Sequence, residues 1–134
     1  MTKAILMSIH PKWAKLIYEG KKTLEWRKTC PKSVGADKVF LYETFPVKKV
    51  TGFFYCVGIE GLSLTDKDAK FLRKDYVESA GCVPMERLKI YQGNSDCIFG
   101  WRIGKVIKFT DVERDLSDFN IKRAPQSWQY VEDK

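Results

Sequence analysis

The sequence contains a single histidine, His10, and only four cysteines, at positions 30, 56, 82 and 97. The cysteines lie 26, 26 and 15 positions apart, which fits neither the C-x-x-C pairs of a zinc site nor a dense disulfide framework. A catalytic Cys–His pair would have to use His10, and nothing in the sequence brings a cysteine beside it. We therefore expect free thiols in a reducing compartment, no bound metal and no cofactor.

The chain also lacks a long hydrophobic run, since no stretch approaches the roughly 18 to 20 apolar residues that a membrane helix needs. Residues 1–10 contain a short apolar run without a small-residue cleavage site, so they predict a first strand rather than a signal peptide. With 44% hydrophobic and 13% aromatic residues, the 134 residues can bury one core, which excludes a disordered or collagen-like chain. We expect a single domain over residues 1–134, located in the cytoplasm and without a membrane partner.

Acidic residues are scarce in the first 50 positions, where four Asp and Glu stand against eleven Lys and Arg. Residues 51–134 hold thirteen of each kind, so the whole net charge of +7 arises from the first 50 residues. A concentrated basic segment favours a polyanionic partner, most often nucleic acid, although such a segment is also commonly a solvated face.

The periodicity of the apolar residues predicts more strands than helices. The expected strands are 3–9, 23–28, 38–44, 49–59 and 97–109, and the expected helices are 11–19, 65–81 and 84–91. Pro11 and Gly20 suit the two ends of the first helix, and Gly100 and Gly104 suggest bends or bulges in the last long strand. The pattern predicts an α+β fold, namely a small closed or nearly closed mixed β-barrel. One helix follows the first strand, and a helical pair is inserted before the last long strand.

Residues 20–27, GKKTLEWR, fit the motif G-x-K-x-x-E-x-R. Lys22 and Arg27 are suitable phosphate donors, and Glu25 can accept from a base amino group or hold Arg27 in one rotamer. Lys22 and Glu25 would face opposite sides of a regular strand, so their convergence requires Lys22 to lie in the turn after Gly20. The alternative is that Glu25 and Arg27 form a surface salt bridge of small energetic value.

The motif resembles the signature of the ASCH domain, a branch of the PUA-like barrel superfamily. Residues 8–13, 44–52 and 123–130 also resemble this family's strand-to-helix opening, third-strand corner and closing segment. The resemblance implies a barrel with a cleft beside the motif strand that receives RNA or a nucleotide. The candidate nucleic-acid contacts are Ser8, Lys21, Lys22, Glu25, Arg27, Tyr42, Thr44, Lys48, Gln126, Ser127 and Trp128.

Three functions remain open from the sequence. The first is an RNA-binding module that regulates transcription or translation. The second is a hydrolase, because the resemblance implies either a ribonuclease or an amidohydrolase of N4-acetylcytidine, with Lys22, Glu25 and Arg27 as catalytic residues. The third is a protein-interaction domain in transcriptional coactivation.

The amidohydrolase branch of the family uses a lysine, a threonine and a glutamate. Lys22 matches its lysine, but Glu25 occupies the threonine position, and those hydrolases are shorter and lack the helical pair. The oligomeric state stays open.

Overall fold

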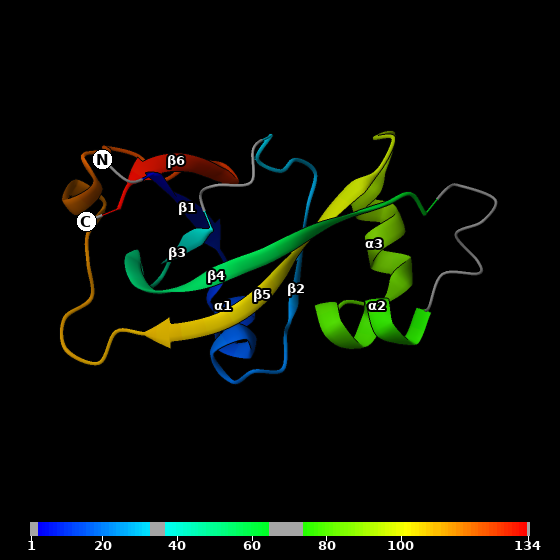
Figure 1. Ribbon diagram of the computed structural model, residues 1–134, viewed down its shortest axis with the longest axis horizontal. Helices are drawn as coiled ribbons and strands as arrows, with labels where there is room; N and C mark the ends of the chain where they lie inside the picture. The colour runs from blue at the N-terminus through cyan, green and yellow to red at the C-terminus, as the bar shows by residue number, and fades with distance from the viewer. Residues whose placement is uncertain (1–2, 33–36, 65–73, 134) are drawn as a thin grey trace.

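Six strands form one mixed sheet in the order β2-β5-β4-β3-β1-β6 (Figure 1). The computed structural model describes residues 3–32, 37–64 and 74–133. The strands are β1 (Lys3–Ile9), β2 (Leu24–Arg27), β3 (Lys38–Glu43), β4 (Lys49–Leu62), β5 (Ile98–Lys108) and β6 (Trp128–Glu132). β1 pairs in parallel with β3, and the other pairs are antiparallel. The α+β fold expected from the sequence is confirmed, although the sheet leaves β2 and β6 at its two edges.

The helix α1 (Pro11–Tyr18) follows β1 as expected, and its ends use the signals that the sequence shows. His10 is the N-cap, and its Nδ1 accepts from the Lys12 backbone N–H at 3.1 Å. Pro11 occupies the first turn, where its missing N–H costs nothing. Gly20 follows the helix with φ +77°, a left-handed conformation that favours glycine. The side chain of the single histidine therefore caps the N-terminus of α1.

The helical pair α2 (Lys74–Gly81) and α3 (Met85–Gln92) lies between β4 and β5 in the chain. It covers the end of the long β4–β5 ribbon that is farthest from the two termini (Figure 1). The apolar cluster beneath the pair includes Leu24 and Trp26 of β2 together with Leu88 of α3. The first part of the expected helix 65–81, residues 65–73, lies outside the described residues. No helix in the described part of the chain is long and apolar enough to span a membrane.

Two further apolar clusters follow from the alternation of side chains along β1 and β3. Ile5 and Met7 belong to the first cluster, which also contains Trp101 and lies against α1. Leu6 and Phe40 point to the opposite face of the sheet and belong to the second cluster. That second cluster is covered by the chain after β5, which includes a 3-10 helix at Leu116–Phe119. Phe119 and Val131 of the C-terminal segment thus belong to the core. The expected irregularity near Gly104 is present as a register shift between the pairs Phe54–Val106 and Cys56–Ile103.

Gly52 in β4 gives a test of how tightly this sheet is packed. A Cβ atom there would lie 2.7 Å from the Tyr18 hydroxyl and still closer to the Ile107 carbonyl oxygen, so backbone would have to move. We predict that Gly52→Ala lowers the free energy of unfolding by about 1 to 3 kcal/mol. Gly61→Ala, in the same strand, is the control, because its Cβ would meet only Phe99 at an ordinary 3.9 Å. Urea unfolding of both variants provides the measurement, and equal stability losses would contradict the packing argument.

Candidate functional site

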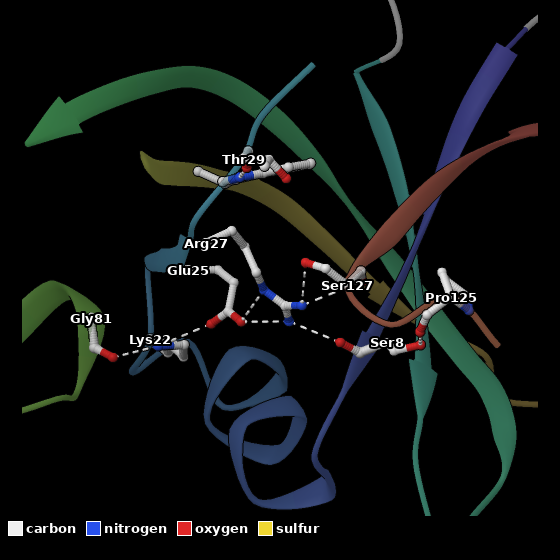
Figure 2. A network of polar contacts seen from close by, with 9 residues as sticks. Ser8, Lys22, Glu25, Arg27, Thr29, Gly81, Pro125 and Ser127 are labelled. Atoms are coloured by element: carbon white, nitrogen blue, oxygen red, sulfur yellow. Dashed lines mark hydrogen bonds and ion pairs between the residues drawn. The ribbon is translucent and has the colours of Figure 1, made fainter. Parts of the chain in front are cut away.

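Three charged side chains of the motif form a buried cluster, which we call the triad: Lys22, Glu25 and Arg27 (Figure 2). Lys22 is 2% exposed, Glu25 6% and Arg27 9%. The Lys22 Nζ lies 3.2 Å from Glu25 Oε1, and the Arg27 Nη2 lies 2.7 Å from Glu25 Oε2. Both oxygens of one carboxylate therefore bind a cation inside the protein.

The local backbone explains how Lys22 and Glu25 meet. Lys22 precedes β2, and its backbone N–H donates to the Leu16 carbonyl at 3.1 Å, so it lies in the turn that leaves α1. Glu25 and Arg27 share one face of β2, while Leu24 and Trp26 share the other. The interpretation of Glu25 and Arg27 as a surface salt bridge is wrong, because both faces of β2 are buried.

Arg27 uses all of its donors inside the protein. Its Nε and Nη2 donate to Glu25 Oε2 at 2.9 and 2.7 Å, and Nη2 also donates to the Ser8 carbonyl at 2.9 Å. Its Nη1 donates to the carbonyl and the hydroxyl oxygens of Ser127 at 3.3 and 3.2 Å. These contacts account for the five N–H groups of a guanidinium. Arg27 thereby joins edge strand β2 to β1 and to the residue before edge strand β6 (Figure 2).

Lys22 joins the motif to the helical pair. Its amine donates to the carbonyl of Gly81 at the end of α2 and lies 5.0 Å from the centroid of the Trp13 ring. Next to it, the Thr23 backbone N–H donates to the Ala80 carbonyl at 2.7 Å. The position of α2 relative to β2 therefore depends on the residues around Lys22.

A cleft of about 680 Å³ lies over the triad. Its described lining combines apolar and aromatic side chains with four basic residues and one acidic residue. The lining residues are Trp13, Lys22, Glu25, Trp26, Arg27, Lys28, Thr29, Val83, Arg87, Leu88, Tyr91, Gln126 and Ser127. Burial raises the pKa of the Tyr91 phenol, so this side chain is an uncharged hydroxyl group at neutral pH. The cleft is thus an apolar hollow with excess positive charge.

The structure brings some of the sequence-predicted residues to this cleft and not others. Gln126 and Ser127 line it beside the triad, and the Ser8 hydroxyl donates to the Pro125 carbonyl at 2.6 Å behind Ser127. Lys21 is exposed next to Lys22 and forms an ion pair with Glu19 at 3.7 Å. The remaining predicted residues lie outside the described cleft lining; they are Tyr42, Thr44, Lys48 and Trp128.

These four residues have other surroundings. Tyr42 is buried in the apolar cluster around Phe40, and Lys48 is exposed in the turn between β3 and β4. Thr44 donates its backbone N–H to the Ile9 carbonyl at 2.9 Å. Trp128 begins β6 rather than lying in a loop, and its ring packs edge-on against Trp101 with centroids 5.5 Å apart. Its indole N–H donates to the Thr29 hydroxyl at 2.9 Å.

Sequence reasoning missed the wall of the cleft that α3 provides. Arg87 and Tyr91 stand four residues apart on α3, and both line the cleft opposite the motif. This i, i+4 spacing of a cation and an aromatic residue was a usable signal, because it places both on one helix face. Among the described residues, no group of three or more His, Cys, Asp or Glu side chains could hold a metal ion. All four cysteines are free thiols.

The fold and the motif together define a family. Residues 7–113 match the ASCH domain, and the chain belongs to the ASCH domain family. A curated relative, the ASCH domain-containing ribonuclease of Zymomonas mobilis, is 40% identical over 57 residues. Those residues are 42% of this chain and 38% of the ribonuclease, so the match spans well under half of that relative.

Solved structures agree on the fold. The crystal structure of ASCH from Zymomonas mobilis is similar to this chain with a TM-score of 0.78 at 22% identity, covering 96% of this chain and 87% of that one. A tyrosine-to-phenylalanine variant of the same protein gives a TM-score of 0.77 at 21% identity, covering 96% and 90%. At this level of identity the likeness establishes the fold alone.

The buried triad generates a prediction about Glu25. Glu25→Gln keeps the size of the side chain but leaves Lys22 and Arg27 in the interior without their counter-charge. We predict a loss of about 3 to 5 kcal/mol in the free energy of unfolding, as for other broken buried ion pairs. Glu19→Gln is the matched control, because it removes the exposed Glu19–Lys21 pair and costs under about 1 kcal/mol. Chemical denaturation of the two variants measures both, and a Glu25→Gln loss as small as the control's would refute the structural role of the carboxylate.

Proposed function

We propose that this ASCH domain binds RNA or a nucleotide-like ligand in the cleft beside β2. The observation that carries the proposal is the composition of that cleft, where four basic side chains surround an apolar and aromatic hollow. Phosphate groups are attracted by the cations, and bases are buried by the aromatic and apolar wall. The basic excess of residues 1–50 supports the same partner, because it raises the positive potential around the motif.

Within the proposal, the cations divide into two roles. The donors of Lys22 and Arg27 are already engaged by the protein, so these residues supply a fixed positive field beneath the ligand. Lys28 and Arg87 are exposed and line the cleft, which makes them the phosphate contacts of first choice. Lys21, Gln126 and Ser127 lie at or beside the same cleft and complete the proposed contact set. A regulatory role in transcription or translation and a cytoplasmic location belong to the same proposal.

RNA hydrolysis is the second candidate, and it is supported by the relative that is named a ribonuclease. Cleavage needs a group that takes a proton from the attacking oxygen and a group that stabilises the phosphorane. The cleft offers Lys22, Glu25 and Arg27 for these roles, whereas His10 serves as the N-cap of α1. Both Glu25 oxygens already pair with cations, so neither is free to contact an attacking oxygen.

Salt dependence tests the binding proposal. The affinity for a fluorescein-labelled single-stranded RNA, measured by anisotropy, is expected to fall with a log–log slope of about −0.7 for each phosphate contacted, so about four contacts give a slope near −3. Arg87→Gln is expected to make the slope shallower by about 0.7. Lys89→Gln, an exposed cation on the same helix but outside the described cleft lining, is the control and leaves the slope unchanged. An RNA affinity that does not change with salt concentration, or the absence of any RNA binding, would refute the proposal.

The hydrolytic candidates are tested on two substrates. We predict no hydrolysis of N4-acetylcytidine, because the Lys22 amine is held by the Gly81 carbonyl and by Glu25 and is therefore not free to contact a substrate. Acetate release that disappears in Lys22→Ala but persists in Lys89→Ala would show this prediction to be wrong. The same three proteins are incubated with end-labelled RNA, and cleavage that follows the same pattern would favour the ribonuclease candidate over binding alone.

A further inference from the structure

Three aromatic side chains line the described part of the cleft, and two of them already have partners on their rings. The amines of Lys12 and Lys22 lie 4.9 and 5.0 Å from the centroid of Trp13. Trp26 is 6% exposed, and Cβ atoms placed on Gly81 and Gly100 would meet it within 3 Å, so protein backbone covers it from both helix and strand. Neither ring offers a free face to a ligand.

Tyr91 differs from both tryptophans. It is 38% exposed, and it lies on the last turn of α3 at the wall of the cleft. Burial raises the pKa of its phenol, so part of the side chain is enclosed by protein while the rest is exposed at the cleft. A partly enclosed aromatic ring loses little conformational entropy when a ligand stacks on it.

Two exposed cations flank this ring. The Lys28 amine lies over the Tyr91 ring, 5.3 Å from its centroid, so a base would stack on the opposite face; Trp13 differs in having two amines over its ring. Arg87 precedes Tyr91 by one helical turn and lines the same cleft, so its guanidinium lies along the same face of α3. An aromatic platform between two cations matches the repeat of a nucleic-acid strand, in which each base is flanked by phosphates.

We propose that an unpaired base of the bound RNA stacks on Tyr91, with Lys28 and Arg87 holding the phosphates on its two sides. The inference rests on the proposed RNA binding and narrows its ligand to single-stranded RNA, because bases within a duplex present no free face to a side chain. It also assigns recognition to the inserted helix α3, whereas the triad maintains the shape and charge of the cleft floor.

The test combines a change in the protein with a change in the RNA. Wild type and Tyr91→Leu are titrated with a fluorescein-labelled single strand of about six nucleotides, intact or with each base in turn replaced by an abasic site. We expect removal of one particular base to weaken wild-type binding by roughly 5-fold to 100-fold, the range for loss of one stacked base. Tyr91→Leu is expected to bind the intact strand more weakly by a similar factor. Its affinity is expected to be the same for the intact and the abasic strand, which in a double-mutant cycle indicates a direct contact.

Two controls separate stacking from folding. Tyr91→Phe keeps the ring and is expected to stay within about twofold of wild type. Tyr55→Leu removes a tyrosine of nearly equal exposure, 37%, that lies outside the described cleft lining, and it is expected to leave binding unchanged. The abasic series on wild type tests base stacking without any variant, and Tyr91→Met, which also removes the ring, takes the place of Tyr91→Leu for the assignment to Tyr91 if that variant fails to fold.

The outcomes distinguish this inference from the proposed function. Salt-dependent RNA binding that is indifferent to every abasic site and equally tight for a duplex would overturn the stacking platform and leave the RNA-binding proposal intact. Absence of any RNA binding by the wild type would overturn both. A base-dependent loss in wild type that Tyr91→Leu retains in full would place the stacked base on another residue and would also overturn the assignment to Tyr91.

Discussion

The Glu25 carboxylate is the contact on which the rest of the site depends. It carries one negative charge in the interior and holds two positive charges, so Lys22 and Arg27 are neutralised only in part. The remaining N–H groups of Arg27 are satisfied by the Ser8 and Ser127 carbonyls and the Ser127 hydroxyl, and the Lys22 amine also donates to the Gly81 carbonyl and lies over the Trp13 ring. Burying charges is tolerable only with such pairing. The result is a buried cleft floor with an excess of one positive charge.

This pairing also explains how a sheet with two open edges keeps its shape. β2 and β6 are not neighbours in the strand order, yet Arg27 links β2 to Ser8 and Ser127, and Thr29 accepts from Trp128 (Figure 2 shows the first of these links). Side-chain hydrogen bonds therefore hold the two edges of this sheet together, as backbone hydrogen bonds between strands do in a closed barrel. On the other side, Lys22 fixes the end of α2. The motif is thus the junction of the sheet, the helical pair and the segment before β6.

The sequence was sufficient for the family and for most of the elements, but not for strand β6 or for the cleft wall. Pro11, Gly20 and the i, i+3, i+4 apolar spacing define α1, because these are local signals that act through the backbone. Alternation along β2 separated Glu25 from Trp26 correctly. It did not reveal that the polar face is buried, because the groups that cover it are Gly81, 59 positions after Lys22, and Ser127, 100 positions after Arg27. Arg87 and Tyr91 were missed for the same reason: their position opposite the motif is set by tertiary packing of α3.

The energetic cost of contacting a phosphate differs between the buried triad and the exposed cations Lys28 and Arg87. For Arg27 to bind a phosphate directly, it would have to give up hydrogen bonds to Glu25, Ser8 or Ser127 that also hold two edge strands together, so each new contact replaces an existing one. Lys28 and Arg87 are exposed, so in the proposed complex a phosphate replaces mainly water around them, together with the contact of the Lys28 amine with the Tyr91 ring, and release of counterions from the RNA makes that exchange favourable. In the proposed complex, direct contacts with Lys28 and Arg87 therefore supply binding free energy, whereas the triad contributes only a positive electrostatic potential. In the proposed binding mode, the motif residues therefore set where RNA lies, while Arg87 and Tyr91 of the inserted helix contact it directly.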